Sequence, residues 1–408
     1  MNQTATNIPA NVPNDRVYDF DVYGFEMEGA EYQEGLKRLQ APEVPEIFWT
    51  TRNGGHWVVT RSEDINAILN KAELFSSHHI SVPKPEEGRQ TLTLKPLQID
   101  PPDHTKYRNL LAPALSPKAV KTLGEDARVL AIELIEGFKN RGECEFIGDF
   151  AAHLPIAIFM NIVDLPESDR ALLTELADAA VRGKNEAKRN EALQKIAGYG
   201  MQKVMERRAN PGTDLISTIA TAKIDGVLVD DNTLAGMILL LLLAGLDTVA
   251  SMLGFFAHFL ACNPEHRKEL IEDPSLIPNA VEELLRRFPI AILAREVKED
   301  TEFKGVVLKA GDMIVAPTPL DGLDDRKFED PLTVDFNRSK PIHATFGGGV
   351  HRCMGSMLAR TELRVFLEEW LKRIPDFQVK SGADVKVSAR NVATVTSLPL
   401  VWDTASTH

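Results

Sequence analysis

Cysteine is scarce in this sequence of 408 residues, which has only Cys144, Cys262 and Cys353. So few cysteines in so long a chain exclude a disulfide framework and indicate a reducing compartment. Cys144 and Cys262 have no partner at a spacing typical of metal ligands, so we predict that both are packing residues. Cys353 follows a run of glycines and needs a separate interpretation.

Positive charge and a leader segment are also lacking. The 46 Lys and Arg residues are outnumbered by 59 Asp and Glu residues, and the net charge of −13 argues against binding to nucleic acid. The N-terminal segment is polar, with no basic stretch followed by an apolar one, so it predicts neither a secretory signal nor a membrane anchor. We expect a cytoplasmic protein.

One long apolar run extends from Leu234 to Cys262, and it is long enough to cross a bilayer. Asp247 and Thr248 interrupt the run, however, and an Asp at the centre of a membrane helix costs about 2.5–3.5 kcal/mol. Lys and Arg also show no asymmetry around it. A helix that is apolar on all sides is equally typical of the centre of a large soluble protein, and we favour that interpretation.

Hydrophobic periodicity predicts a mainly α chain with small β-sheets. Two stretches, Phe75–Ile99 and Pro317–Thr345, are expected to be irregular, and a break is expected at Asn210–Asp214. The other expected elements are a strand at His56–Arg61, helices at Ser62–Asn70, after Pro102 and at Glu282–Phe288, a hairpin over Glu302–Ala316 that turns at Ala310–Asp312, a helix over Cys353–Arg373 and a strand-like tail over Val392–Trp402.

The segment FGGGVHRCMG, from Phe346 to Gly355, is the most informative one. Glycines let a backbone come close to a flat ligand, and a helix starting at Cys353 would direct unpaired N–H groups at its sulfur. Two other interpretations are an inert buried thiol and a phosphate-binding loop. The absence of a following Gly-Lys-Ser/Thr argues against a phosphate-binding loop, and the four matched positions described next argue against both.

Phe346, Gly349, Cys353 and Gly355 match the pattern Phe-x-x-Gly-x-x-x-Cys-x-Gly, which resembles the heme-binding loop of the cytochromes P450. The resemblance implies that Cys353 is the axial ligand of the iron of heme b. It covers nearly the whole chain, and therefore implies a single domain over residues 1–408 with the heme between the central long helix and the helix of the cysteine loop.

The segment AGLDT, Ala244 to Thr248, resembles the oxygen-activating pattern of the same family. The resemblance implies that Asp247 and Thr248 are catalytic and supply protons during the activation of O2. For an Asp-Thr pair alone, a helix cap or a satisfied pair in the core would be an equally good interpretation.

The segment ELLR places Glu283 and Arg286 three residues apart on one helix face. On a surface such an ion pair would contribute almost nothing. The resemblance to the Glu-x-x-Arg motif instead implies a buried structural pair that supports the cysteine loop, and Arg338 is the candidate third member.

Four cationic residues match positions that bind the heme propionates in the family. His104 and Arg108 are four residues apart on one predicted helix face, while Arg295 and His351 come from later segments. Arg binds carboxylates through a bidentate fork, so the resemblance implies that these four residues hold the two propionates.

Several segments, among them GLDTV, EELLRRF and LPLVWD, resemble the bacterial camphor hydroxylase group of this family. This implies a monomer that receives electrons from NADH through a flavin-containing ferredoxin reductase and a [2Fe–2S] ferredoxin. Because the chain is acidic, an acidic ferredoxin would need a local basic patch. The candidates, which are equally well interpreted as ordinary surface charges, are Lys106, Arg108, Arg352 and Arg360.

The loop before Asp100 departs from that group. In the camphor hydroxylase, a tyrosine in this loop hydrogen-bonds the ketone of the substrate. The corresponding position in this chain, counted back from Asp100-Pro101-Pro102, is Leu92. Loss of this donor removes discrimination for a carbonyl, so camphor is a doubtful substrate. Possible replacement donors are His78, His79, Thr91 and Thr93. The implied apolar pocket is lined by Leu92, Leu97, Leu240, Leu243, Ala244, Ala291 and Leu293.

The sequence therefore predicts a heme-thiolate monooxygenase that hydroxylates a small apolar terpenoid or an ionone-like norisoprenoid with O2. One alternative is peroxide-driven oxidation by the same heme, against which the Asp247–Thr248 pair argues. A second alternative is a non-catalytic heme-thiolate sensor, which should lack a closed apolar pocket and a proton relay.

Overall fold

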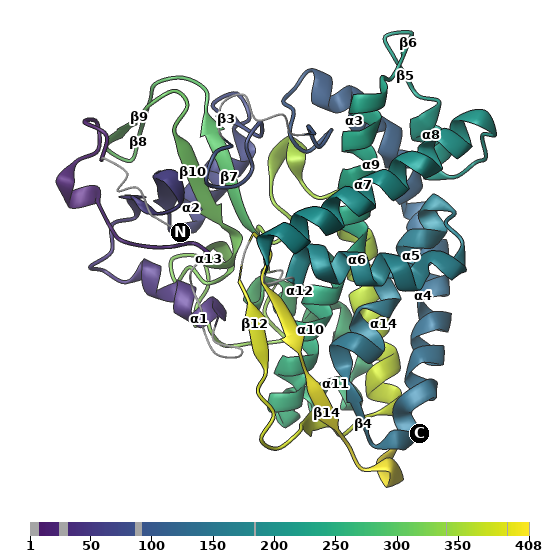
Figure 1. Ribbon diagram of the computed structural model, residues 1–408. Helices are drawn as coiled ribbons and strands as arrows, with labels where there is room; N and C mark the ends of the chain where they lie inside the picture. Colours follow the sequence, from purple (N-terminus) through teal and green to yellow (C-terminus); the bar gives the residue numbers. More distant parts are fainter. Residues whose placement is uncertain are drawn as a thin grey trace.

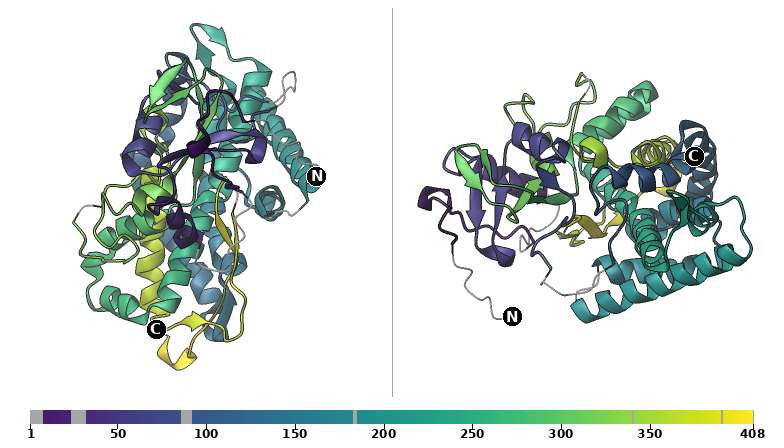
Figure 2. Two further views of the ribbon diagram at one scale, coloured as in Figure 1. Left: turned by 90° about the vertical axis from the view of Figure 1, so that its left-hand side faces the viewer. Right: turned by 90° about the horizontal axis from the view of Figure 1, so that it is seen from above.

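The computed structural model describes residues 8–23, 32–85, 92–182, 185–339, 341–389 and 391–407, and the statements below concern these residues. Helices predominate and the sheets are small, so the predicted mainly α fold with small β-sheets is confirmed (Figure 1). A β-rich part and a larger helical part lie side by side in Figure 1, and the right-hand view of Figure 2 shows the same arrangement from above.

The β-rich part is built on a five-stranded sheet in the order β1-β2-β10-β7-β3. Strands β2 and β10 are parallel, and the other neighbours are antiparallel. The sheet thereby joins chain segments that lie far apart in the sequence. Its strands are β1 (Ile47–Thr50), β2 (His56–Val59), β3 (Phe75–Ser76), β7 (Ile292–Val297) and β10 (Met313–Pro317).

The hairpin predicted to turn at Ala310–Asp312 turns elsewhere. Strands β8 (Thr301–Phe303) and β9 (Val306–Leu308) pair around Lys304 and Gly305, which both have positive φ. These two φ angles suit the tight two-residue turn that joins twisted antiparallel strands. The segment at Ala310–Asp312 instead leads the chain into β10, which pairs with β7.

The remaining strands are β4 (Glu143–Glu145), β5 (Lys223–Ile224), β6 (Val227–Leu228), β11 (Gln378–Val379), β12 (Lys386–Ser388), β13 (Thr394–Ser397) and β14 (Pro399–Val401).

The helices agree with most of the predicted positions. The predicted helix at 62–70 forms, the next begins at Asp103 after the two prolines, and the chain breaks at residues 210–214. Their bounds are α1 (Tyr32–Lys37), α2 (Ser62–Asn70), α3 (Asp103–Leu111), α4 (Pro117–Phe138), α5 (His153–Val163), α6 (Arg170–Arg182), α7 (Glu186–Ala209), α8 (Leu215–Ala220), α9 (Asp231–Leu246), α10 (Thr248–Cys262), α11 (Pro264–Glu272), α12 (Ile277–Arg287), α13 (Thr318–Gly322) and α14 (Ser356–Arg373).

The apolar run forms two consecutive helices, α9 and α10, and not one uninterrupted helix. The break falls at Asp247, whose φ of −134° is not helical. The Thr248 hydroxyl donates a hydrogen bond of 3.1 Å to the Ala244 carbonyl, an acceptor that an uninterrupted helix would use for its backbone. By length and composition the combined segment could cross a membrane, but 53% of its most apolar window is buried inside the protein.

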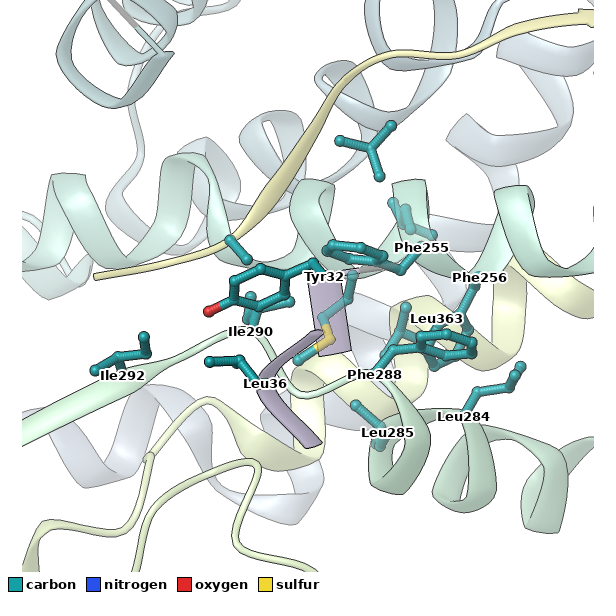
Figure 3. Close-up of a cluster of buried hydrophobic side chains, with 14 of the residues drawn as sticks. Tyr32, Leu36, Phe255, Phe256, Leu284, Leu285, Phe288, Ile290, Ile292 and Leu363 are labelled. Atoms are coloured by element: carbon teal, nitrogen blue, oxygen red, sulfur yellow. The ribbon is translucent and has the colours of Figure 1, made fainter. Parts of the chain in front are cut away.

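The main hydrophobic core lies where the β-rich part meets α10, α12 and α14. Figure 3 shows Phe255, Phe288, Ile290 and Leu363, from different segments, converging there with the N-terminal Tyr32. The stripe predicted on α14, Ala359, Leu363, Phe366 and Trp370, is buried throughout.

The two cysteines predicted to pack inside the protein differ. Cys144 on β4 is buried, as predicted. Cys262 is exposed, so that prediction was wrong. It is the last residue of α10, where the helix leaves the core, and its Sγ lies 3.6 Å from Nε2 of His258 one turn earlier.

Candidate active site

The glycine-rich loop closes on itself before Cys353. The Cys353 N–H donates a 2.9 Å hydrogen bond to the Phe346 carbonyl, which joins the two ends of the motif. Gly347 and Gly349 have φ angles of 70° and 59°, which glycine adopts without strain. A Cβ on Gly349 would also lie 2.9 Å from the Leu69 carbonyl oxygen, so glycine lets the loop pack against α2.

The helix that follows begins at Ser356, three residues later than predicted. A turn at Met354 and Gly355 precedes it, so Cys353 stands before the helix. The positive end of the α14 dipole still lies one turn away, and the Gly355 N–H hydrogen-bonds to the sulfur.

The Cys353 thiol is solvent-accessible but largely surrounded by protein. These surroundings raise its pKa, while the Gly355 N–H and the positive charges of Arg108, Arg360 and Arg352 act in the opposite direction. A metal ion deprotonates a coordinating thiol outright. The same N–H and guanidinium groups would then stabilise the thiolate.

The four predicted propionate ligands come together from α3, β7 and the cysteine loop. The rings of His104 and His351 are 4.4 Å apart between centroids. Arg108 donates a 2.6 Å hydrogen bond to the Arg352 carbonyl, and Arg295 donates one of 2.7 Å to the Ala294 carbonyl. Burial and then the charge of Arg295 lower the pKa of His351 to about 3, and burial lowers the pKa of Arg295 to about 10.

This cluster fits an anionic ligand. Both ring nitrogens of His104 and Nε2 of His351 are buried without a hydrogen-bond partner among the described residues. The Asp100 carboxylate, 4.0 Å from His351, is the counter-charge that the structure places beside this ring. Each neutral imidazole ring has one N–H donor, and unpaired donors beside the buried Arg295 guanidinium call for further acceptors. The two propionates of heme, next to a potential thiolate ligand, are of the right chemistry.

The predicted catalytic pair lies at the break between α9 and α10, and its two members differ in exposure. Asp247 is 3% exposed and accepts a 3.2 Å hydrogen bond from the Ser251 hydroxyl, whereas Thr248 is exposed. A Cβ on Gly245 would lie 2.2 Å from the Phe159 ring, so glycine allows α5 to approach this break.

The predicted structural triad is assembled. Arg286 binds Glu283 through two hydrogen bonds of 2.8 Å, and Arg338 Nε lies 3.1 Å from the Glu283 carboxylate. Glu283 and Arg286 are completely buried. Arg286 also donates to the carbonyls of Gly322, Pro331 and Thr333. The triad therefore fixes the irregular segment that leads to the cysteine loop.

All of the predicted pocket residues except Ala244 are half-buried, and several of them lie beside fully buried neighbours. Leu240 and Leu243 on α9 flank Leu242, which is inaccessible, and Leu293 on β7 lies between the buried Ile292 and Ala294. Leu92, Leu97 and Ala291 are also half-buried, and Ala244 is exposed. The Leu293 Cδ1 lies 3.7 Å from where a Cβ of Gly347 would be, which links the pocket residues to the cysteine loop. Met354 packs against the same cluster as Leu243.

Some of the basic residues predicted to contact a ferredoxin are already paired with acidic side chains. Lys106 pairs with Asp103 and Asp225, and Arg360 pairs with Glu282, so these two charges are neutralised. Arg352 is exposed.

Among the possible substrate donors, His79 lies 3.7 Å from Glu296, His78 is exposed, and Thr91 is outside the described residues.

Two features of the site escaped the sequence interpretation. Asp100 faces His351, and its position four residues before His104 was the available signal. Glu282 binds both Arg360 and His343, and the Arg360 guanidinium lies 4.6 Å from the centroid of the Phe346 ring. No local pattern links these side chains, because they come from α12, α14 and the loop.

Four features together define a heme-thiolate protein. They are the mainly helical fold, the buried triad, the cluster of Arg and His side chains, and the cysteine that follows a glycine-rich loop. Comparison with known proteins agrees. The family model "Cytochrome P450" matches residues 156–400. The chain is 33% identical over 88% of its length to "Probable cytochrome P450 127A1" of Sinorhizobium fredii, covering 87% of that protein.

Two solved structures extend the likeness to nearly the whole chain. CYP101J2 has a TM-score of 0.87 and 39% identity, and CYP101C1 has a TM-score of 0.88 and 37% identity. Each comparison covers 97% of this chain and 100% of the other. The chain belongs to the cytochrome P450 family, in the camphor-hydroxylase-like group. It is a P450 monooxygenase, and its cofactor is heme b.

Proposed function

We propose that this monooxygenase hydroxylates a small apolar substrate, a terpenoid or an ionone-like norisoprenoid, in the cytoplasm. The observation that carries the proposal is the set of half-buried leucines, Leu92, Leu240, Leu243 and Leu293, on three separate segments. An apolar pocket with few polar groups favours a compact hydrocarbon skeleton. Heme, when bound to Cys353, supplies the activation of O2.

The lack of a tyrosine argues against camphor. The hydroxyls of Tyr23, Tyr107 and Tyr199 are near other groups, namely the Val82 N–H, Lys95 and Asp169. Tyr32 is buried in the core, and Tyr18 is exposed. These are the five tyrosines of the chain, so we infer that none of them supplies the phenolic donor that is missing at Leu92. A substrate ketone would therefore be held by shape more than by a phenolic hydrogen bond.

For the chain's own residues we propose three roles. His104, Arg108, Arg295 and His351 hold the propionates, and Phe346, Gly349 and Gly355 shape the loop that presents Cys353. Thr248 and Asp247 move protons to the reacting oxygen: Thr248 is accessible, and Asp247 lies behind it with a hydrogen bond from Ser251. Glu283, Arg286 and Arg338 support the loop without taking part in the reaction.

We further propose that the protein is a monomer that receives electrons from NADH through a ferredoxin reductase and a [2Fe–2S] ferredoxin. Since Lys106 and Arg360 are paired, Arg352 is the best of the four candidate contacts. Val350 and Met357, which are 42% and 47% exposed near it in the sequence, add apolar contact area. Reversing the charge in Arg352→Glu should raise the KM for ferredoxin several-fold, whereas Lys372→Glu at the far end of α14 should not.

The proposal is tested by optical titration of the purified holoenzyme. The carbon monoxide complex of the reduced protein should first show the red-shifted Soret band of a thiolate-ligated heme. Ionones and monoterpenes should then convert the ferric heme to high spin, and camphor should do so weakly. Absence of a shift with every terpenoid would refute the substrate class. Turnover with peroxide alone, or no turnover with NADH and ferredoxin, would favour the peroxide-driven enzyme or the sensor.

A further inference from the structure

A lysine in the pocket loop reaches across to two helices. Lys95 Nζ lies 3.1 Å from the Thr233 hydroxyl in the first turn of α9 and 3.4 Å from the Tyr107 hydroxyl on α3. It also lies 4.8 Å from the centroid of the Tyr107 ring, within range of a cation–π interaction. Lys95 is half-buried and Thr233 is 6% exposed, so water screens these contacts only in part.

The charge of Lys95 has a suitable neighbour. Asp230 caps α9 by accepting a 2.9 Å hydrogen bond from the Thr233 N–H. The Lys95 ammonium contributes to the low pKa of Asp230, after the hydrogen bonds from Thr233. Asp230 therefore offsets the repulsion that a cation would meet at the positive end of the helix dipole.

A second contact holds the same loop two residues earlier. The Thr93 carbonyl lies directly on Gly236 of α9, and a Cβ there would be 2.0 Å from that oxygen. No side chain fits at this distance, so the backbone of the loop rests on the backbone of the helix. The turn that contains Lys95 is closed by the Gln98 N–H, which donates to the Leu94 carbonyl at 2.9 Å.

We propose that Lys95 and Gly236 form a latch that positions residues 92–98 against α9 and so determines how ligands enter and leave the pocket. The inference rests on the proposed pocket, because Leu92 and Leu97 lie on either side of the two contacts. Lys95 is a positioning residue and touches no reacting atom. The Lys95 and Thr93 contacts fix the loop at two points on α9, so a ligand that enters past this loop would have to displace both contacts or wait for the loop to open.

The test uses the holoenzyme and 4-phenylimidazole, which binds ferric heme whatever the natural substrate. Stopped-flow absorbance of the Soret band gives its association and dissociation rates in Lys95→Met and Gly236→Ala. Loss of a hydrogen bond to a charged group should raise both rates roughly tenfold. Matched controls are Lys372→Met, an exposed lysine, and Gly198→Ala, a helical glycine with no neighbour within 4 Å.

A merely structural role predicts a different result, namely a lower melting temperature with unchanged rates. A Cβ on Gly236 would meet the Thr93 carbonyl oxygen at 2.0 Å, so Gly236→Ala should displace the loop and raise the rates even if it also lowers the melting temperature. In Lys95→Met, the rates should increase with little change in melting temperature, because Lys95 is only half-buried. Rates within twofold of the wild type in either variant would overturn the latch. If the azole rates change as expected and no terpenoid shifts the spin state, the substrate class is wrong and the latch stands.

Discussion

At the scale of the residue, Thr248 is the side chain with the most specific expected role. Its hydroxyl donates to the Ala244 carbonyl and remains accessible, while Asp247 beside it is buried. A hydroxyl in this position can accept a proton from one group and donate its own to another. The local backbone break thus replaces one helical backbone hydrogen bond with one from the Thr248 side chain, at the position where we propose a proton relay.

Thr248→Ala should keep the rate of NADH consumption within a fewfold but divert most of it from hydroxylated product to hydrogen peroxide, because protons no longer reach the correct oxygen. The ratio of peroxide formed to NADH consumed measures this directly. Thr174→Ala is the control, since Thr174 makes a similar hydrogen bond to a helical carbonyl on α6, outside the site. Full coupling in Thr248→Ala would show that the residue is not part of a relay.

Glu362 on α14 presents a second question at this scale. It is 2% exposed, and its Oε2 has no hydrogen-bond partner among the described residues. Burial raises its pKa to about 8 from an ordinary value of 4.5. The folded protein therefore holds a proton that the unfolded chain releases above about pH 4.5. The stability linked to this proton is complete below pH 4.5 and is lost as pH rises towards 8.

Glu362→Gln removes this titration while keeping the shape of the side chain. The melting temperature of the variant should exceed that of the wild type at pH 7.5 and fall less between pH 5 and 8, the linked effect being about 1.4 kcal/mol per pH unit. Thermal denaturation at several pH values measures it, with the exposed Glu125→Gln as control. Parallel pH profiles for variant and wild type would show that Glu362 is charged in the folded protein.

At the scale of the element, α12 connects the core to the cysteine loop. Its inner face carries apolar side chains into the core of Figure 3, and its Glu283 and Arg286 bind the irregular segment. Gly322 allows this contact, since a Cβ there would lie 2.0 Å from the Arg286 carbonyl oxygen. One helix thus fixes a loop that has no regular structure of its own.

Glu283→Gln should destabilise the protein by about 3–5 kcal/mol, because it leaves the Arg286 charge buried without its partner. Denaturant unfolding of the purified protein and the heme content after expression are the measurements. Glu265→Gln, at an exposed position on α11, is the matched control. An unchanged unfolding midpoint with full heme content would mean that the backbone carbonyls around Arg286 suffice.

At the scale of the whole molecule, the two hydrophobic clusters meet at helix α5, which contributes side chains to both. The main cluster includes Ile158 of α5, and the second cluster includes Ile156 and Phe159 of the same helix. Ile162 packs against both. Separate unfolding of either cluster would expose one face of α5 to water, which is unfavourable for a helix that is apolar on all sides.

We therefore expect the holoenzyme to unfold as the single domain that the sequence predicts. Differential scanning calorimetry should show one transition, and loss of the Soret band and of helical circular dichroism should coincide. Two resolved transitions, with heme released in the first, would show that the clusters unfold independently.

The sequence by itself determined the class of protein and was enough to propose the residues of its site. Local patterns were sufficient because a thiolate loop, a Glu-x-x-Arg helix and an interrupted apolar helix each need particular residues at short, fixed spacings. The four propionate candidates and the third member of the triad, Arg338, were likewise predicted, and the structure brings them together.

Only the tertiary structure decided which charges are free and where elements begin. Arg360 is neutralised by Glu282, more than 70 residues away in the sequence, which no local pattern reveals. Lys106 pairs with the distant Asp225 as well as with Asp103 one turn earlier. Helix α14 starts after Gly355, and the Cys353 N–H before it is bonded to the Phe346 carbonyl. The segment at Ala310–Asp312 does not turn back on itself because it leads into β10, which pairs with the distant strands β2 and β7. The Lys95–Thr233 and Thr93–Gly236 contacts arise for the same reason: packing places together residues that the chain keeps apart.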